Sequence, residues 1–213
     1  MSLPDAPAPF DRRFGVLARS PCPPFAELLV ALEREFRAVD TRATSDRLDE
    51  LARPLFPLAA QSADERAGAL AMAARIAAPH DALEPTAWML SQALRTGRIA
   101  PAVRAVLAAE LGRRAGIAAG VFRHRERWMV LVGDGDTRFA ADVGPETATW
   151  PGSPCGRRCS GAPHCSHGLA FEVLGGLAAA WTTAGDERHA RRAAALRLEL
   201  PFEAASRRAA DED

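Results

Sequence analysis

The chain has 213 residues, of which 48% are hydrophobic and 25% are charged, so it can form one compact domain or a domain with a small appendage. Its 27 basic residues, all arginine, balance 27 acidic residues, so the sequence lacks the basic excess that is typical of nucleic-acid binding. It has neither a signal-peptide core nor an apolar run of about 18 residues, so we expect a cytoplasmic protein with no membrane partner, whose cysteines are reduced or metal-bound.

A proline-rich tail or surface strap is predicted over 1–24, and two helices follow it. Apolar residues recur over 25–39 with the 3.6-residue period of an amphipathic helix. Either Asp40 or Ser45 can cap the second helix, because both side chains accept hydrogen bonds from backbone N–H groups. Proline interrupts the hydrogen bonds of a helix, so we expect the second helix to end at Pro54.

Two further helices are predicted from the residues at their ends. Ser62 and Glu65 have the spacing of a capping box, which predicts a third helix that continues to Ala78. Pro85 suits the first turn of a fourth helix. The N–H groups of the first turn have no partner within the helix, so a proline, which has no N–H group, costs no hydrogen bond there. Gly97 follows the apolar residues of the fourth helix and is expected to end it.

The stretch 97–143 predicts one helix followed by a small antiparallel sheet. The helix opens at Pro101 and ends at Gly116, with an apolar stripe between them. The sequence Gly-Asp-Gly-Asp over 133–136 is typical of a tight turn between two strands. The expected strands cover 117–122, 128–132 and 138–143.

The last third of the chain is predicted to form a loop and then a helical pair. Residues 144–168 are rich in proline and glycine, which favour irregular backbone. Over 169–201 two helical patterns meet at Gly185, and Asp186 is placed to cap the second helix, so the two helices are expected to pack antiparallel. The polar tail 202–213 is expected to be disordered.

The predicted elements make a mostly helical α+β fold with its core over 25–143. Three stretches of the chain carry a resemblance to a known family. They are LLVALEREFRAVDTRATSDRLDELA over 28–52, the segment 97–143 with its RRAGI and FAADVGP motifs, and the helical pair over 169–201. In order and spacing they resemble the SirB-type transglutaminase-like proteins of bacteria. The resemblance implies N-terminal helices, a transglutaminase-like helix with a small antiparallel sheet, and a TPR-like helical hairpin at the C-terminal end.

The resemblance also implies where a catalytic triad would lie. Active transglutaminase-like enzymes use cysteine, histidine and aspartate, and the thiolate attacks a carbonyl group. The cysteine position corresponds to Ala102 and the aspartate position to Asp142. The histidine position corresponds to Arg127, or to Glu126 if the alignment shifts by one. Alanine is no nucleophile and arginine keeps its proton, so no thiol acyl transfer is expected. His124 is either a replacement base or a solvent-exposed histidine.

The altered triad has two interpretations. In the first, Asp142 and Arg127 form a buried ion pair with a structural role. In the second, the vacated cleft over Ala102 binds a ligand, Arg127 holds an anion, and Asp142 acts as acid or base. Glu126 and Trp128 would then contact the substrate beside Ala102. This second interpretation requires an apolar pocket, because burial is what raises the pKa of a carboxylate toward neutrality.

A cluster of cysteine and histidine lies in the predicted loop. Cys155, Cys159 and Cys165, with either His167 or His164, can supply the four ligands of a tetrahedral zinc site. Such a site would be structural, because four protein ligands leave no open position. The alternatives are a Cys155–Cys159 disulfide, or free thiols with His167 capping or packing at a helix start.

Three functions remain open from the sequence. The first is a catalytically degenerate transglutaminase-like protein that binds a protein partner or a small-molecule ligand as an accessory module. The second is a cofactor-free acid–base enzyme, such as a cyclase, dehydratase or hydrolase of a bacterial biosynthetic pathway, which uses the vacated cleft. The third is a zinc-dependent enzyme. No organic cofactor is expected in any of them.

Overall fold

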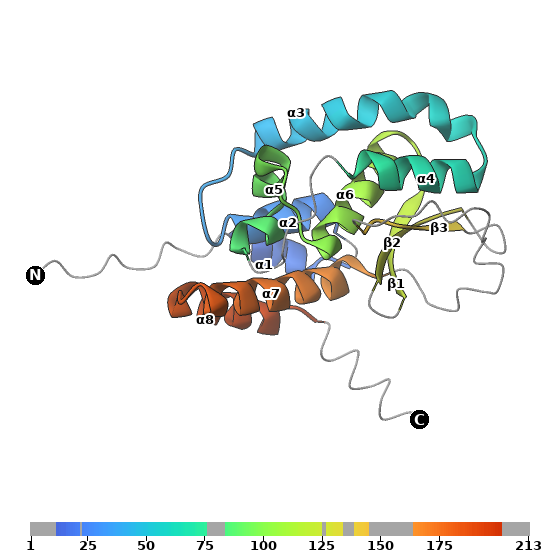
Figure 1. Ribbon diagram of the computed structural model, residues 1–213. Coiled ribbons are helices and arrows are strands. Elements are labelled where there is room, and N and C mark those ends of the chain that lie inside the picture. Colours follow the sequence, from blue (N-terminus) through green and yellow to red (C-terminus); the bar gives the residue numbers. More distant parts are fainter. Residues whose placement is uncertain are drawn as a thin grey trace, which may run out of the picture.

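The computed structural model describes residues 12–21, 23–75, 84–124, 127–133, 139–144 and 164–201. The protein has a mostly helical α+β fold with a small three-stranded antiparallel sheet, which confirms the predicted class (Figure 1). None of the described helices combines the length and the hydropathy that a membrane span needs. In chain order the elements are α1 (Arg12–Arg19), α2 (Phe25–Glu33), α3 (Thr41–Ala52), the 3-10 helix η1 (Arg53–Ala60), α4 (Ala63–Ala73), the 3-10 helix η2 (Pro85–Trp88), α5 (Leu90–Thr96), α6 (Pro101–Arg114), β1 (Ala119–His124), β2 (Arg127–Val132), β3 (Phe139–Asp142), α7 (Ser166–Thr183) and α8 (Glu187–Leu198).

Helix α6 is the centre of the fold. Eleven of its fourteen residues are buried, and it contacts α2, α3, α4, α7, β1 and β2. Small residues allow this crowding: a Cβ atom added at Gly112 would lie only 2.9 Å from the Leu70 side chain. Pro101 stands in the first turn, and Gly116 follows the helix at φ +74°, a left-handed conformation that glycine adopts without strain. Both predicted helix signals are confirmed.

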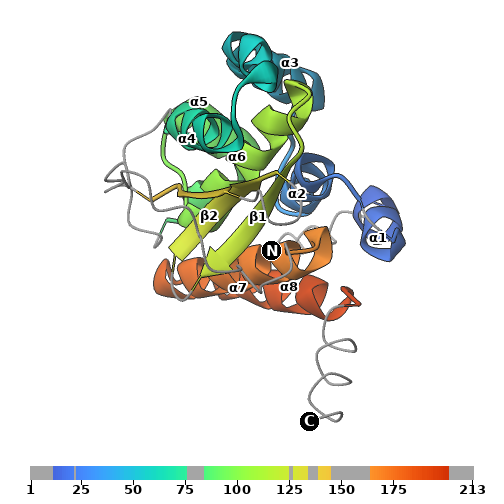
Figure 2. The same ribbon diagram turned by 90° about the vertical axis from the view of Figure 1, so that its right-hand side faces the viewer.

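The sheet is an antiparallel meander in the order β1-β2-β3, and α4 and α6 pack on it. Val121, Val130 and Val132 are almost fully buried and belong to the core that α4 and α6 cover. Side chains alternate between the two faces of a strand. Arg127 therefore projects from the opposite face, and so does Asp142, which pairs with Met129 across β2 and β3. Figure 2 turns the right-hand side of Figure 1, where the sheet lies, toward the viewer.

The predicted helix ends are confirmed where they depend on capping residues. Asp40 caps α3, since its carboxylate accepts the N–H of Ala43 at 2.9 Å. Ser62 and Glu65 form the capping box of α4. The carboxylate of Asp186 likewise caps α8, as expected. These predictions succeed because a cap depends on residues within one turn of the chain.

Three helices differ from the prediction. Part of the predicted tail 1–24 forms α1, whose Phe14 side chain is buried in the core. The helix predicted over 25–39 ends at Glu33. The single helix predicted between Pro85 and Gly97 is two, because Met89 has an extended backbone (φ −107°, ψ 117°) that separates η2 from α5.

Other boundaries shift by a few residues. Helix α3 stops at Ala52, and η1 continues through Pro54 because a 3-10 turn tolerates proline near its start. Helix α4 ends at Ala73 rather than Ala78, and 76–83 lies outside the described residues. Helix α7 begins at Ser166, earlier than predicted, because the Cys165 sulfur caps it by accepting the N–H of Gly168 at 3.3 Å.

The C-terminal helical pair packs below the core in the view of Figure 1. Helices α7 and α8 pack against each other and turn at Gly185, which has φ +76°. The pair joins the core where the Trp88 ring of η2 rests on Gly176 of α7. A second link is the ion pair between Arg192 of α8 and Glu35, which follows α2. The pair is therefore anchored along its length.

Candidate functional site

The start of α6 meets the ends of two strands, where the family resemblance would place a triad. The guanidinium group of Arg104 donates a hydrogen bond to the Val143 carbonyl oxygen at 3.0 Å. The Val143 N–H group in turn donates to the Trp128 carbonyl oxygen at 3.2 Å. Ala102, which lies at this end of α6, is only 1% exposed. Because Trp128 and Val143 are buried as well, this end of α6 is packed with side chains.

Arg127 and Asp142 form an ion pair at the sheet surface. A nitrogen of Arg127 lies 3.2 Å from Asp142 Oδ2, and the exposed side-chain fractions are 63% and 12%. The other carboxylate oxygen, Oδ1, accepts the N–H of Gly144 at 2.7 Å. The predicted pair thus forms, but on the surface instead of in a buried cleft. Each Asp142 oxygen already has a hydrogen-bond donor.

The predicted site residues do not converge on one cavity. Ala102 belongs to the helix that covers one face of the sheet, whereas Arg127 and Asp142 project from the other face. His124 is paired with Arg127 across the two strands and is exposed on that same outer face. Glu126 lies outside the described residues. The structure therefore brings Arg127 together with Asp142 but separates both from Ala102.

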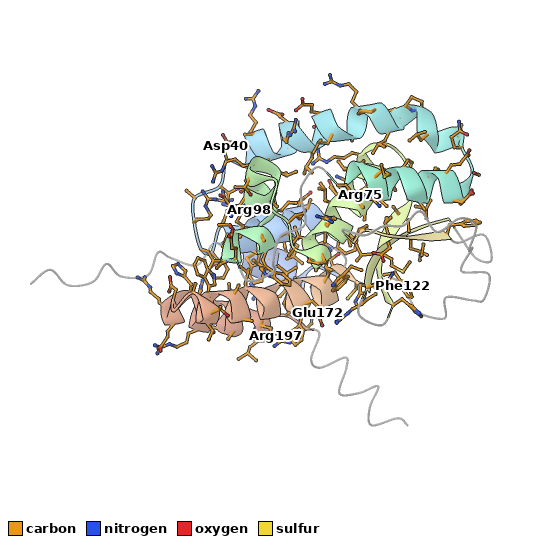
Figure 3. The ribbon with its side chains drawn as sticks, viewed as in Figure 1. Asp40, Arg75, Arg98, Phe122, Glu172 and Arg197 are labelled. Atoms are coloured by element: carbon orange, nitrogen blue, oxygen red, sulfur yellow. The ribbon has the colours of Figure 1, made fainter. Side chains whose placement is uncertain are left out.

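A different polar cluster, which the sequence did not reveal, surrounds Trp128 at the end of the hairpin. The Arg123 guanidinium group lies 5.4 Å from the centre of the Trp128 ring, and the His164 ring lies 5.4 Å from it. Arg123 also pairs with Glu172 of α7 at 3.4 Å. Figure 3 shows Glu172 pointing from α7 toward the part of the sheet where Phe122 is labelled. The cluster therefore ties the hairpin to α7.

The backbone reinforces the contact at His164. Its N–H group donates to the Val121 carbonyl oxygen at 2.8 Å, on the free edge of β1. Burial is the main cause that lowers the pKa of His164; Glu172 opposes this shift and Arg123 adds to it. A neutral His164 suits a place beside the Arg123 cation. These groups tie the hairpin and the start of α7 together.

The predicted zinc ligands are described only in part. Cys155 and Cys159 lie outside the described residues. Cys165 is exposed at the start of α7. His167 is 7% exposed, and its Nε2 atom has no hydrogen-bond partner among the described groups. A buried ring nitrogen without a partner fits a ligand nitrogen. His164, the alternative ligand, instead packs against Trp128. Within the described part of the chain no three such ligands come together.

The geometry at the start of α6 decides what chemistry is available there. Ala102 has no reactive atom, and the acid and base candidates lie on the far face of the sheet. Comparisons with protein-family models, with curated proteins and with solved structures find no match to this chain. The placement of these side chains and the sequence resemblance are therefore what indicates a function.

Proposed function

We propose that the protein is a catalytically degenerate, SirB-type transglutaminase-like module that binds a partner and performs no thiol acyl transfer. The observation that carries this proposal is the buried methyl group of Ala102 at the position of the nucleophile. Acyl transfer requires a thiolate or hydroxyl group at that position, with a base within hydrogen-bond reach. The Arg127–Asp142 pair on the opposite face supplies neither.

The alternative of a cofactor-free acid–base enzyme has less support. Such an enzyme needs a carboxylate that opens into an apolar, water-excluding pocket. Asp142 instead accepts hydrogen bonds from Gly144 and Arg127, and the Arg127 side chain is mostly exposed to solvent. The helical pair α7–α8 favours the binding function, because paired helices of this kind present surfaces to protein partners.

The first prediction concerns activity at the altered triad. Purified protein is expected to hydrolyse p-nitrophenyl acetate, and to turn over model amides and thioesters, no faster than buffer does. Asp142→Ala is expected to leave these rates unchanged and to lower stability by about 1 kcal/mol, because the Gly144 N–H group and Arg127 lose an acceptor. The rates come from spectrophotometric assays, and the stability comes from urea denaturation.

Asp142→Asn is the matched control for this experiment. Asparagine keeps the acceptor for Gly144 and removes the charge that faces Arg127. The proposal would be refuted by a reaction of the purified protein that both Asp142→Ala and Asp142→Asn, with the same fold, abolish. Catalytic turnover of this kind would make Asp142 an acid or a base.

The second prediction concerns metal. We propose that Cys155, Cys159, Cys165 and His167 hold one structural zinc ion, with the orphaned Nε2 atom of His167 as the fourth ligand. Protein purified without chelator is expected to contain about one zinc per chain by plasma mass spectrometry. Chelation is expected to lower the melting temperature, because zinc bound only by the folded state stabilises it.

Cys22 provides the matched control for the zinc prediction. Of the four cysteines in the chain, it is the one that lies outside the cluster in the sequence. Cys155→Ser and Cys159→Ser are each expected to reduce the zinc content to well below half, and Cys22→Ser is expected to leave it unchanged. A metal-free wild-type protein, or an equal loss in all three variants, would contradict the zinc site.

A further inference from the structure

A cavity of about 250 Å³ lies at the opposite end of α6 from Ala102. Its walls come from α1, α2, residues 41–48 of α3 and residues 110–114 of α6. Figure 2 draws α1 and α2 at the right of the molecule with α3 above them. Its lining includes the apolar side chains of Ala26, Val30, Ala31 and Leu48.

The charges around this cavity are unequal. Four arginines and two glutamates line it among the described residues, and Asp49 pairs with one of these arginines, Arg114, which leaves a local excess of one positive charge. Arg13 and Arg113 are each 59% exposed at the side chain, and Arg34 is exposed as well, so three of the cations lie at the rim. Glu27, one of the two acids, pairs with Arg13 at 3.6 Å.

Ion pairs hold the part of the cavity wall that the end of α6 provides. Glu110 is 2% exposed, and its carboxylate accepts hydrogen bonds from Arg113 at 2.6 and 2.9 Å and from Arg114 at 2.8 Å. The carboxylate is the main cause that raises the pKa of Arg113, so this guanidinium group stays charged. Arg114 extends the network to Ser45 and Asp49 of α3. Arg113 and Arg114 are therefore held in place before any ligand arrives.

We propose that this cavity binds a small organic anion, a carboxylate with a short apolar body. The cationic rim selects a negative group, because guanidinium groups bind carboxylates with directed hydrogen bonds. The apolar side chains of the lining contact the apolar part of the ligand. A volume of 250 Å³ lies below the roughly 300–1,000 Å³ of sites for drug-sized ligands, so the ligand has about a dozen non-hydrogen atoms.

This inference goes beyond the proposed function. Ala102 and Arg113 are separated along α6 by roughly 16 Å, at 1.5 Å per residue, so the cavity is distinct from the altered triad. A failure of anion binding would leave the absence of acyl transfer untouched, and the activity assays do not involve the cavity. The two proposals are therefore tested separately.

The experiment is a titration followed by two-dimensional NMR of the ¹⁵N-labelled full chain. The probes are benzoate, its neutral isostere benzamide, and sulfate, which lacks the apolar body. Benzoate is expected to bind with a Kd of about 1 mM, as suits a ligand of this size, and the other two at least about tenfold more weakly. The largest shifts are expected at Val30, Ala31 and Thr44 in the cavity wall.

Arg34→Gln and its control test the role of the rim. Removal of the Arg34 charge is expected to weaken benzoate binding roughly three- to tenfold. Arg191→Gln removes the same charge from an exposed pair on α8, outside the cavity lining, and is expected to leave the affinity unchanged. Equal binding of benzamide, shifts that map elsewhere, no binding of benzoate at 20-fold the expected Kd, or equal weakening by both variants would each overturn the inference.

Discussion

Gly176→Ala is expected to destabilise the protein by about 2–3 kcal/mol, although alanine is the better helix former. A Cβ atom on Gly176 would lie 2.3–2.4 Å from three carbon atoms of the Trp88 ring. These atoms belong to a rigid ring, so the clash requires a movement of η2 or α7. Chemical denaturation followed by circular dichroism measures the loss. The contact is the one that seats the helical pair on the core.

The neighbouring Gly175 is the control for this substitution. A Cβ atom there would meet the Arg197 guanidinium group at 3.6–3.8 Å, an ordinary contact distance. Gly175→Ala is therefore expected to stabilise the helix by up to about 1 kcal/mol. Trp88→Leu is expected to restore most of the stability that Gly176→Ala loses, which a double-mutant cycle detects. Similar losses for both glycine variants would show that the Trp88 contact is not the cause.

Glu33→Ala is expected to cost about 2 kcal/mol at neutral pH, because two donors lose their acceptor. Glu33 is fully buried at the end of α2, and its carboxylate accepts the Ser91 N–H at 2.8 Å and the Ser91 hydroxyl at 2.5 Å. This contact caps the start of α5 from a distant helix. Glu33→Gln keeps an acceptor and is expected to cost less; urea denaturation compares the two.

The same residue makes stability depend on pH. Burial is the main cause that raises the pKa of Glu33 above 4.5, while Ser91 and Arg37 oppose the shift. The folded state therefore favours the protonated acid, and this contribution is present below the unfolded pKa and is lost as the pH rises through the folded pKa. Relative to wild type, Glu33→Gln is expected to gain stability between pH 4 and 7. A constant difference across this range would contradict the assignment.

Sequence reasoning predicted the elements whose ends depend on nearby residues. Asp40, Asp186 and the glycine after α6 each act within one turn of their own helix, so their positions were visible in the chain. The break at Met89 was not visible, because its cause includes the carboxylate of Glu33 on another helix. Helix α1 was missed because the prolines around it favoured an irregular tail.

For the candidate site, the sequence predicted which residues lie on neighbouring strands but not which face of the sheet they occupy. The pairing of Arg127 with Asp142 follows from adjacent antiparallel strands and was expected. The face of the sheet on which this pair lies was not predictable, because Met129 and Leu131 are as apolar as the residues that alternate with them. Without an alternating pattern, the sequence does not say which side chains face the helix that carries Ala102. The cavity near Glu110 joins four helices and has no sequence signal.

Helix α6, with eleven of its fourteen residues buried, has a consequence for how the chain unfolds. It contacts the N-terminal helices, the sheet and α7 at once. If any one of these layers detached, apolar surface of α6 would be exposed to water, at roughly 25 cal/mol per Å². Partial opening is therefore penalised on every side of the helix, and these layers are expected to lose their structure in a single cooperative transition.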